Sequence, residues 1–298
     1  MSHNHSADVK SKRFVISLSL TGLIFFAEFF GGFWTGSLAL LSDSAHVFMD
    51  AFALGLSYLA LRAAALPANK KHTYGYHRMQ VLAALINGAT LLLIAVEILR
   101  EAWGRFKNPS PVDAGPMLVI AVIGLIVNLI VAFVLREHDH DDLNTRSAFL
   151  HVLGDALASV GVIGVGVALL FVNWTWLDPL VSVLIALLVL VSSGRVLKES
   201  IHILAEGMPE GIALDDVSAA IRSVEGVENV HDLHVWTVAP DYIALSAHVQ
   251  VENQKVSQTE QIINALKKIL HDKFEIHHTT LQFECENCGQ DNILCQAE

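Results

Sequence analysis

The first two thirds of the chain alternate between long apolar stretches and short polar connections. A helix that crosses the ~30 Å hydrocarbon core of a membrane needs about 20 mostly apolar residues. Six stretches meet this requirement and predict six transmembrane helices, at residues 14–34, 37–61, 81–103, 117–135, 148–172 and 177–203. An even number of crossings places both ends of the chain on the same side of the membrane.

The last third has shorter apolar periods, typical of a small water-facing domain. Helical and alternating patterns predict helix, strand, strand, helix and strand in that order, at residues 213–224, 230–238, 242–251, 257–274 and 279–284. Ser257, with Glu260 three residues later, suggests a capping box at the start of the second helix. This order predicts an α+β domain of the ferredoxin-like kind.

Composition agrees with a membrane protein joined to a soluble part. Hydrophobic residues make up 53% of the chain and charged residues only 16%, against roughly a quarter in an average soluble domain. Residues 1–204 hold fourteen basic and fourteen acidic residues, whereas residues 205–298 hold five basic and sixteen acidic ones. We therefore expect an N-terminal tail over residues 1–13, a transmembrane domain over 14–204 and a separate domain over 205–298.

The distribution of Lys and Arg predicts the orientation. Cytoplasmic loops carry an excess of these residues. Eleven lie on the side of the two termini and only three, Arg100, Arg105 and Lys107, lie on the other. Both termini are therefore expected in the cytoplasm, and the composition favours no nucleic-acid partner.

Ionisable residues inside the apolar stretches point to function. A charged side chain at mid-membrane costs at least about 2.5 kcal/mol, so it is seldom kept without a role. His46 and Asp50 in the second stretch, and His151 and Asp155 in the fifth, are each four residues apart and share a helix face. Two such faces would supply two imidazoles and two carboxylates, which suits tetrahedral Zn²⁺. The alternative is a pair of hydrogen bonds that only join the two helices.

Other polar residues lie near this quartet. Asp43, one turn before His46, either lines a path to the site or caps the start of its helix. Glu28, Asn87 and Asn128 are expected to make interhelical hydrogen bonds or to line a water path.

A second group of metal-binding residue types lies in the acidic domain. It contains six histidines, Glu284 and all three cysteines: His231, His234, His248, His271, His277, His278, Cys285, Cys288 and Cys295. Cys285-x-x-Cys288 has chelating spacing but supplies only half of a tetrahedral site, so a reduced tail is an equal alternative. His3, His5 and the loop at 137–142 either attract metal toward the entrance or are merely solvated.

Several motifs resemble the cation diffusion facilitator family, in particular its bacterial zinc, cadmium and cobalt efflux branch. They are Gly-Ser-Leu-Ala-Leu-Leu-Ser-Asp-Ser-Ala-His at 36–46 with Asp50, His-Thr-Tyr-Gly-Tyr-His-Arg at 72–78, Leu-His-Val-Leu-Gly-Asp at 150–155, Asp-Pro-Leu-Val-Ser at 178–182 and His-Asp-Leu-His-Val-Trp at 231–236. One departure is Gln80, where many members of the family carry Glu.

The resemblance implies a homodimer in the bacterial inner membrane that exports divalent metal in exchange for protons, with no organic cofactor. It places His46, Asp50, His151 and Asp155 at the transport site. It also implies that the domain over 205–298 binds metal and dimerises. Three further implications concern single positions: ligand positions of regulatory sites at His231, His248, His277 and Glu284, a loop ligand at His72, and a coupling contact between Arg78 and Glu206.

Metal choice and energy source follow from chemistry. Imidazole favours borderline metals, so Zn²⁺ is expected first, with Cd²⁺ and Co²⁺ as companions. Metal binding requires neutral imidazole and ionised carboxylate, so it releases protons, and the chain contains no nucleotide-binding motif. Two rival classes remain: a metal-dependent membrane enzyme, for which no His-Glu-x-x-His signature is present, and a non-transporting metal sensor.

Overall fold

The computed structural model describes residues 3–136, 143–172, 174–240, 242–285 and 293. Side chains are described at these positions except at 3–18, 50, 54, 131–136 and 143–155. The chain forms two compact units, one of residues 1–56 and 86–196, the other of residues 57–85 and 197–298. Three helices, α2, α3 and α6, contribute to both units.

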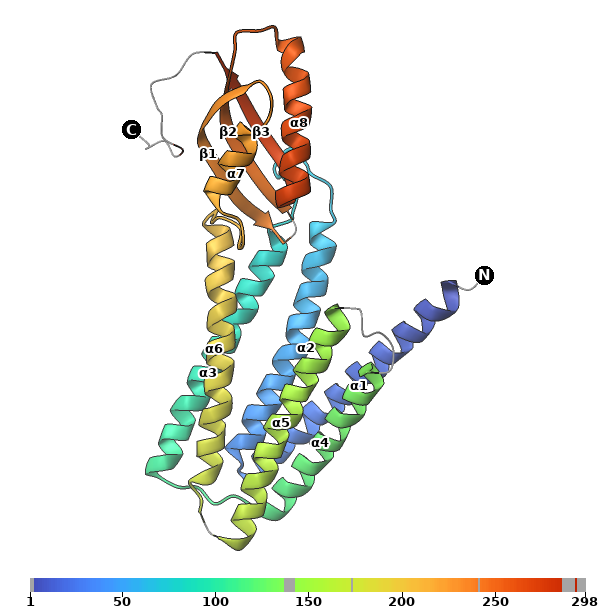
Figure 1. Ribbon diagram of the computed structural model, residues 1–298. Coiled ribbons are helices and arrows are strands. Elements are labelled where there is room, and N and C mark those ends of the chain that lie inside the picture. Colours follow the sequence, from blue (N-terminus) through green and yellow to red (C-terminus); the bar gives the residue numbers. More distant parts are fainter. Residues whose placement is uncertain (1–2, 137–142, 173, 241, 286–292, 294–298) are drawn as a thin grey trace. The chain divides into compact units, whose positions relative to one another are not determined.

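Six long helices occupy the six predicted apolar stretches (Figure 1). They are α1 (His3–Thr35), α2 (Leu38–Ala64), α3 (Met79–Lys107), α4 (Ala114–Arg136), α5 (Leu143–Phe171) and α6 (Leu177–Leu204). Among residues with described side chains, α2, α3 and α6 are long and apolar enough to cross a membrane, and α4 and α5 contribute the shorter apolar segments 114–130 and 156–171. The structure thus has the helical membrane architecture that the sequence predicts.

Within the first unit, one apolar cluster joins four helices near the beginning of α2. It is formed by Ala39, Leu40, Met117, Ala121, Val162, Val165 and Ile185. Many large apolar side chains of the same helices are instead exposed, for example Leu157 and Leu188 at 66% and 73%. Such exposure would be costly in water but suits contact with lipid.

The second unit contains a three-stranded sheet with two helices packed on one face (Figure 1). Its elements are α7 (Leu214–Arg222), β1 (Val227–Ala239), β2 (Tyr242–Val251), α8 (Val256–Phe274) and β3 (Ile276–Glu284). β2 pairs antiparallel with β1 and parallel with β3. The parallel pair requires a crossover, which α8 supplies. The predicted order of elements is confirmed.

Alternation along β2 separates a core face from a polar face. Leu245, Ala247 and Val249 join the core beneath α7 and α8, so His248 lies on the opposite face. The same holds for β3, where Leu281 and Phe283 pack against the core and Glu284 does not. The sheet therefore presents polar side chains away from its helices.

The predicted capping box at Ser257 is wrong. Helix α8 begins at Val256, with Lys255 as its N-cap residue, and the Lys255 backbone N–H donates to Gln258 Oε1 at 2.9 Å. The glutamine supplies the side-chain acceptor one turn into the helix, so Ser257 is already inside it. Gln258 accepts a hydrogen bond from the N-cap backbone as well as Glu260 would, so the capping box is formed by Lys255 and Gln258 in place of Ser257 and Glu260.

Candidate metal sites

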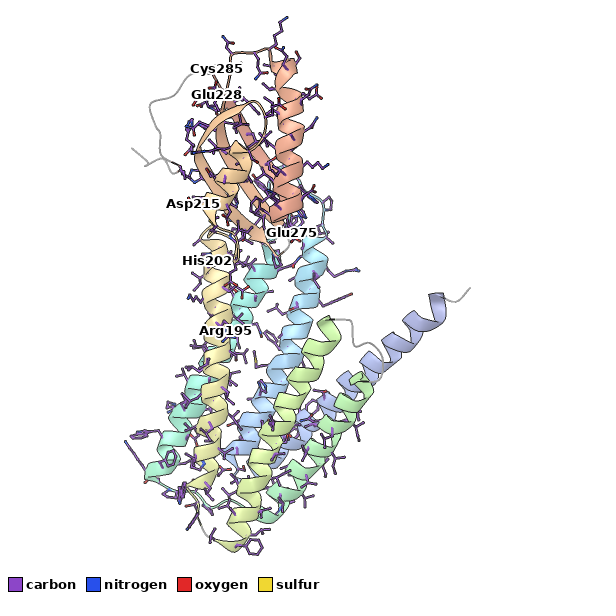
Figure 2. The ribbon with its side chains drawn as sticks, in the orientation of Figure 1. Arg195, His202, Asp215, Glu228, Glu275 and Cys285 are labelled. Carbon is purple, nitrogen blue, oxygen red and sulfur yellow. The ribbon has the colours of Figure 1, made fainter. Side chains whose placement is uncertain are left out.

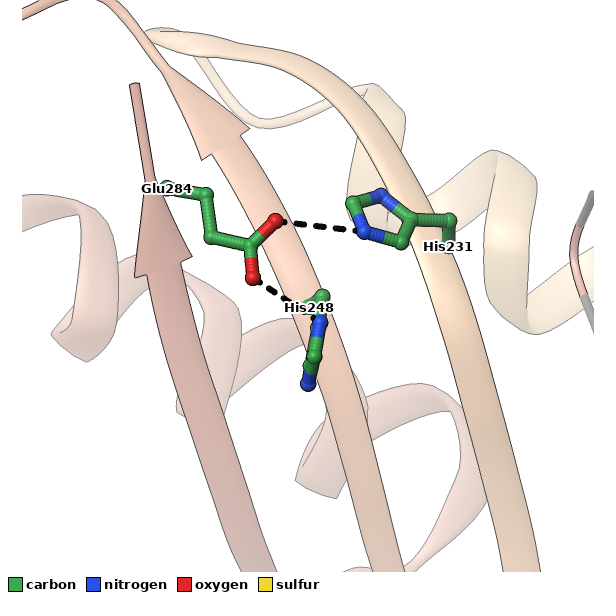
Figure 3. Close-up of side chains that lie close together, drawn as sticks. All are labelled: His231, His248 and Glu284. Carbon is green, nitrogen blue, oxygen red and sulfur yellow. Dashed lines mark ion pairs between the residues drawn. The ribbon is translucent and has the colours of Figure 1, made fainter. Parts of the chain in front are cut away.

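Two histidines and one glutamate meet on the polar face of the sheet (Figure 3). His231 Nε2 lies 3.2 Å from Glu284 Oε2, and His248 Nδ1 lies 2.9 Å from Glu284 Oε1. His231 and His248 are directly paired across β1 and β2, and β3 brings Glu284 alongside. One ligand atom from each residue lies within 4.8 Å of the other two. Two imidazoles and a carboxylate form a donor set that suits Zn²⁺.

Asp232 extends this group, and sequence reasoning missed it. Its carboxylate lies 3.0 Å from His234 Nε2 and 3.6 Å from His248 Nε2. Asp232 has a φ of 48°, in the left-handed region, where β1 changes register between His231 and His234. Aspartate tolerates this conformation better than most residues, and a carboxylate that orients a ligating imidazole is common around metals.

Two other predicted ligands of this domain that the structure describes, His277 and Cys285, do not join the group. The exposed His277 stacks on His271 at 5.2 Å between ring centroids. Cys285 is exposed at the opposite end of β3 from Glu275 (Figure 2). Cys288, Cys295 and the loop at 137–142 lie outside the described residues.

His72 lies in the connection between α2 and α3 and is exposed. Its ring packs on Tyr76 at 4.4 Å, while its backbone N–H donates to Asn69 Oδ1 at 3.0 Å. Asn69 also donates to Tyr76 Oη at 3.0 Å. Among the described residues, the only group of three candidate ligands is the one on the sheet, so this turn brings His72 to no such group.

Arg78 and Glu206, which the resemblance to the family pairs, lie in contact within the second unit. Arg78 Nη2 donates to Glu206 Oε1 at 3.2 Å. Arg78 ends the connection between α2 and α3, and Glu206 follows the end of α6. The contact therefore joins the cytoplasmic ends predicted for three helices.

In the first unit, buried polar side chains connect three helices. Ser159 of α5 donates to Asp43 Oδ2 of α2 at 3.4 Å, and Asn128 of α4 donates to Ser159 Oγ at 3.5 Å. Asp43, Asn128 and Ser159 are exposed by 2%, 7% and 0%. Asp43 lies in the second turn of α2, which begins at Leu38, so it does not cap that helix. Sequence reasoning assigned no role to Ser159, because a lone serine in an apolar helix carries no signal.

The predicted transport quartet lies on two of these helices. His46 is a partly buried residue of α2, three positions after Asp43. The side chains of Asp50, His151 and Asp155 lie outside the described residues, although the backbone of α2 and α5 passes through all three positions.

The structure combines long apolar helices, which bury acidic and amide groups between them, with a domain that gathers imidazoles and carboxylates. These features define an integral membrane carrier for cations. Comparison with known proteins agrees. Residues 14–205 match the cation efflux transmembrane domain, and residues 209–286 match the cytoplasmic domain of cation efflux proteins.

Two curated relatives match along nearly their whole length. The "Cadmium, cobalt and zinc/H(+)-K(+) antiporter" of Bacillus subtilis is 43% identical, over 99% of this chain and 96% of the relative. The zinc transporter ZitB of Pectobacterium atrosepticum is 39% identical, over 100% of this chain and 93% of the relative. The solved metal-bound C-terminal domain of the CzcD transporter of Cupriavidus metallidurans, at 36% identity, matches 24% of this chain and 99% of that domain, with a TM-score of 0.23.

The chain belongs to the cation efflux family, the cation diffusion facilitators, as its motifs predicted. It is a multi-pass membrane protein for the efflux of metal cations.

Proposed function

We propose that this chain exports Zn²⁺ from the cytoplasm in exchange for protons and also carries Cd²⁺ and Co²⁺. The relatives named for zinc, cadmium, cobalt and proton antiport support this choice of metals and of counter-ion. The chemistry of the proposed ligands agrees, because imidazole favours borderline metals over Mg²⁺ or Ca²⁺. The chain is a carrier and not an enzyme, and needs no organic cofactor.

The proposed transport site consists of His46, Asp50, His151 and Asp155. The observation that carries this proposal is the buried contact between Asp43 and Ser159, which joins α2 to α5. A carboxylate kept inside apolar helices is costly unless it has a role. This contact also fixes which turns of the two helices are neighbours.

Helix geometry then relates the quartet to that contact. The two helices run in opposite directions (Figure 1). At 1.5 Å per residue, His46 is about 4.5 Å along α2 from Asp43, and Asp155 is about 6 Å back along α5 from Ser159. In the same direction, Asp50 is about 10.5 Å along α2 from Asp43, and His151 is about 12 Å along α5 from Ser159. Each His is thus at the level of an Asp of the other helix, as a four-ligand site requires.

Proton exchange follows from the ligands. Zn²⁺ binds neutral imidazole and ionised carboxylate, so loading from the cytoplasm releases protons. Imidazole titrates near pH 6.5 in model peptides, so a modest fall in pH on the outer side favours protonation and metal release. The protons then return inward with the empty site, and the proton gradient drives export.

The proposed topology has six crossings with both termini in the cytoplasm of a bacterial inner membrane. We propose the limits 1–13 for the tail, 14–204 for the transport domain and 205–298 for the cytoplasmic domain. The excess of Lys and Arg on the side of the termini supports the orientation.

The cytoplasmic domain is proposed to bind regulatory Zn²⁺ and to hold two copies of the chain together. His231, His248 and Glu284 fit the metal, because they supply three donors in mutual reach. His277, Cys285, Cys288 and His72 are weaker candidates for further ligands. Sixteen acidic residues in this domain repel a second copy, and bound cations relieve that repulsion.

Zinc flux into proteoliposomes tests the function. With a Zn²⁺-sensing dye inside and an imposed pH gradient, the intact chain should move Zn²⁺ in the direction opposite to protons, and collapse of the gradient should abolish accumulation. The transport of each zinc ion should also change the pH inside the vesicles, and a second dye inside them measures this change. A sensor would bind Zn²⁺ without flux, and a membrane enzyme would show no dependence on the gradient, so either result would contradict the proposal.

A further inference from the structure

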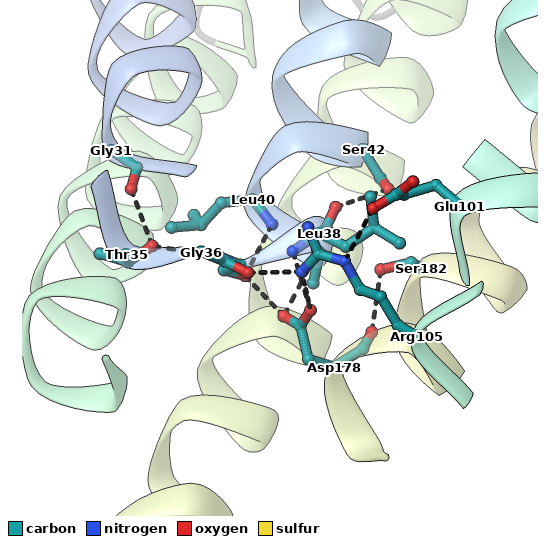
Figure 4. Close-up of polar contacts among 12 residues, drawn as sticks. Gly31, Thr35, Gly36, Leu38, Leu40, Ser42, Glu101, Arg105, Asp178 and Ser182 are labelled. Atoms are coloured by element: carbon teal, nitrogen blue, oxygen red, sulfur yellow. Dashed lines mark hydrogen bonds and ion pairs between the residues drawn. The ribbon is translucent and has the colours of Figure 1, made fainter. Parts of the chain in front are cut away.

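The start of α2 is tied to α6 by one buried carboxylate, that of Asp178 (Figure 4). Ser37 Oγ donates to Asp178 Oδ1 at 2.6 Å, the Leu38 backbone N–H donates to Oδ2 at 2.8 Å, and the Ala39 backbone N–H donates to Oδ1 at 3.3 Å. Asp178 is 0% exposed. It lies in the first turn of α6, so the N-termini of two helices share one negative charge.

A third helix supplies the counter-charge. Arg105, in the last turn of α3, places Nη1 3.7 Å from Asp178 Oδ2 and also donates to the Gly36 carbonyl. Its side chain is only 15% exposed. Gly36 has a φ of +71°, which permits the sharp turn between α1 and α2 that presents this carbonyl.

The cluster is built so that the carboxylate is needed for more than its charge pair with Arg105. Ser37 acts as the N-cap of α2, because its Oγ accepts from the Leu40 N–H at 3.2 Å while donating to Asp178. The carboxylate oxygens therefore satisfy three donors that a guanidinium at the same place could not. Hydrogen bonds to a buried charge are stronger than those between neutral groups, so these contacts stabilise the start of α2.

We infer that Asp178 is a positioning residue for transport: it fixes the outer end of α2 against α3 and α6 and so sets the place of the His46 turn. His46 lies eight residues beyond Leu38, about 12 Å along the same helix. Metal coordination tolerates errors of only about 0.2 Å, so a slipping α2 would impair ligand geometry. This role rests on the proposed zinc transport and extends it to residues that contact no metal.

Zinc flux as a function of Zn²⁺ concentration tests the inference with Asp178→Asn, which keeps the size of the side chain but removes its charge. The half-saturating Zn²⁺ concentration should rise at least about tenfold, the equivalent of losing one charged hydrogen bond. A role in folding alone would lower the maximal rate through loss of active protein and leave half-saturation unchanged. That result would overturn the inference.

Two further variants separate a helix anchor from a simple ion pair. Asp178→Glu keeps the carboxylate and should recover part of the affinity. Asp178→Arg combined with Arg105→Asp restores opposite charges but faces two helix N-termini with a cation, so it should not recover affinity. Recovery by this exchange would overturn the inference. Glu101→Gln is the matched control, because Glu101 pairs with the same Arg105 at 3.3 Å and, within the described part of the chain, forms no hydrogen bond with α2, so it should behave as the unaltered chain.

Hydrogen exchange gives a readout that does not depend on transport. The amides of Leu38 and Ala39 should exchange at least about tenfold faster in Asp178→Asn, with the effect continuing toward His46. Unchanged exchange would overturn the inference. If the unaltered chain moves no zinc while exchange still responds, the proposed function fails and the anchoring of α2 stands.

Discussion

Arg78 Nη2 donates to Glu206 Oε1 at 3.2 Å, although both side chains remain accessible, at 41% and 64%. Glu206 has a φ of 60°, so the chain turns sharply as it leaves α6 and directs this carboxylate toward the connection between α2 and α3. An exposed ion pair contributes only about 0–1 kcal/mol to stability. The contact therefore matters more for the position of the helix ends than for the stability of the protein.

Reversing one of these charges should slow transport without unfolding the protein. We expect Arg78→Glu to lower the initial zinc flux severalfold, because like charges then repel at the ends of α3 and α6. Adding Glu206→Arg should restore part of the flux. Initial rates for both single variants and the double variant decide the point. If the double variant is no faster than the single ones, the two charges do not act as a pair.

Removing one of the proposed anionic ligands should abolish transport. Asp50→Ala or Asp155→Ala deprives Zn²⁺ of charge compensation where a low dielectric makes it most important. We expect no flux above that of empty vesicles, while size-exclusion profiles stay unchanged. Glu97→Gln is a suitable control, since Glu97 is a surface residue of α3 paired with Arg100. Near-normal flux in the Asp155 variant would refute the assignment of the site.

Changing one ligand type should change the choice of metal. His46→Asp replaces imidazole by carboxylate, so we expect the preference for Zn²⁺ over Mn²⁺ to fall and Cd²⁺ to compete differently. Competition of these metals against zinc flux measures the effect. An unchanged order of preference would mean that the geometry of the site, and not the ligand type, selects the metal.

Metal removal should destabilise the cytoplasmic domain. A ligand at one hundred times its dissociation constant adds about 2.7 kcal/mol of stability, so chelation of the intact protein should lower the melting temperature of this domain. His248→Ala should abolish that zinc-dependent shift. His271→Ala removes an exposed imidazole from the same domain and should retain it. A shift that survives in His248→Ala would place the stabilising metal elsewhere.

Truncation after Ala205 should leave a chain that inserts into the membrane but dimerises poorly. The removed part carries all of the excess negative charge and the sheet with the proposed metal ligands. Cross-linking in detergent measures the dimer. A truncated chain that remains fully dimeric would place the main dimer contact among the helices.

The elements themselves could be predicted because each follows a simple pattern, either a long apolar run or a regular period. β2 occurs at the residues that its alternation predicts, 242–251, and the six apolar stretches all became helices. Contact with lipid enforces the apolar runs and burial in a core enforces the periods, so a single sequence displays both.

Departures from a period could not be foreseen. Strict alternation along β1 would place His231 and Leu233 on one face, yet Leu233 joins Val230 in the core. The left-handed backbone of Asp232 and the register shift reverse, within three residues, which side chains of β1 face the core. Asp178 likewise appeared only as part of a motif, because its partners Ser37 and Arg105 are far from it in sequence and no local signal connects them.

The contact between Arg78 and Glu206 spans 128 positions. Ribosomes add roughly 5–20 residues per second, so Arg78 is made about 6–26 seconds before its partner exists. During that interval, the connection between α2 and α3 emerges with neither α6 nor the sheet available. Insertion of the first helices must therefore proceed without this contact, and the joining of the helix ends belongs to the last stage of biogenesis.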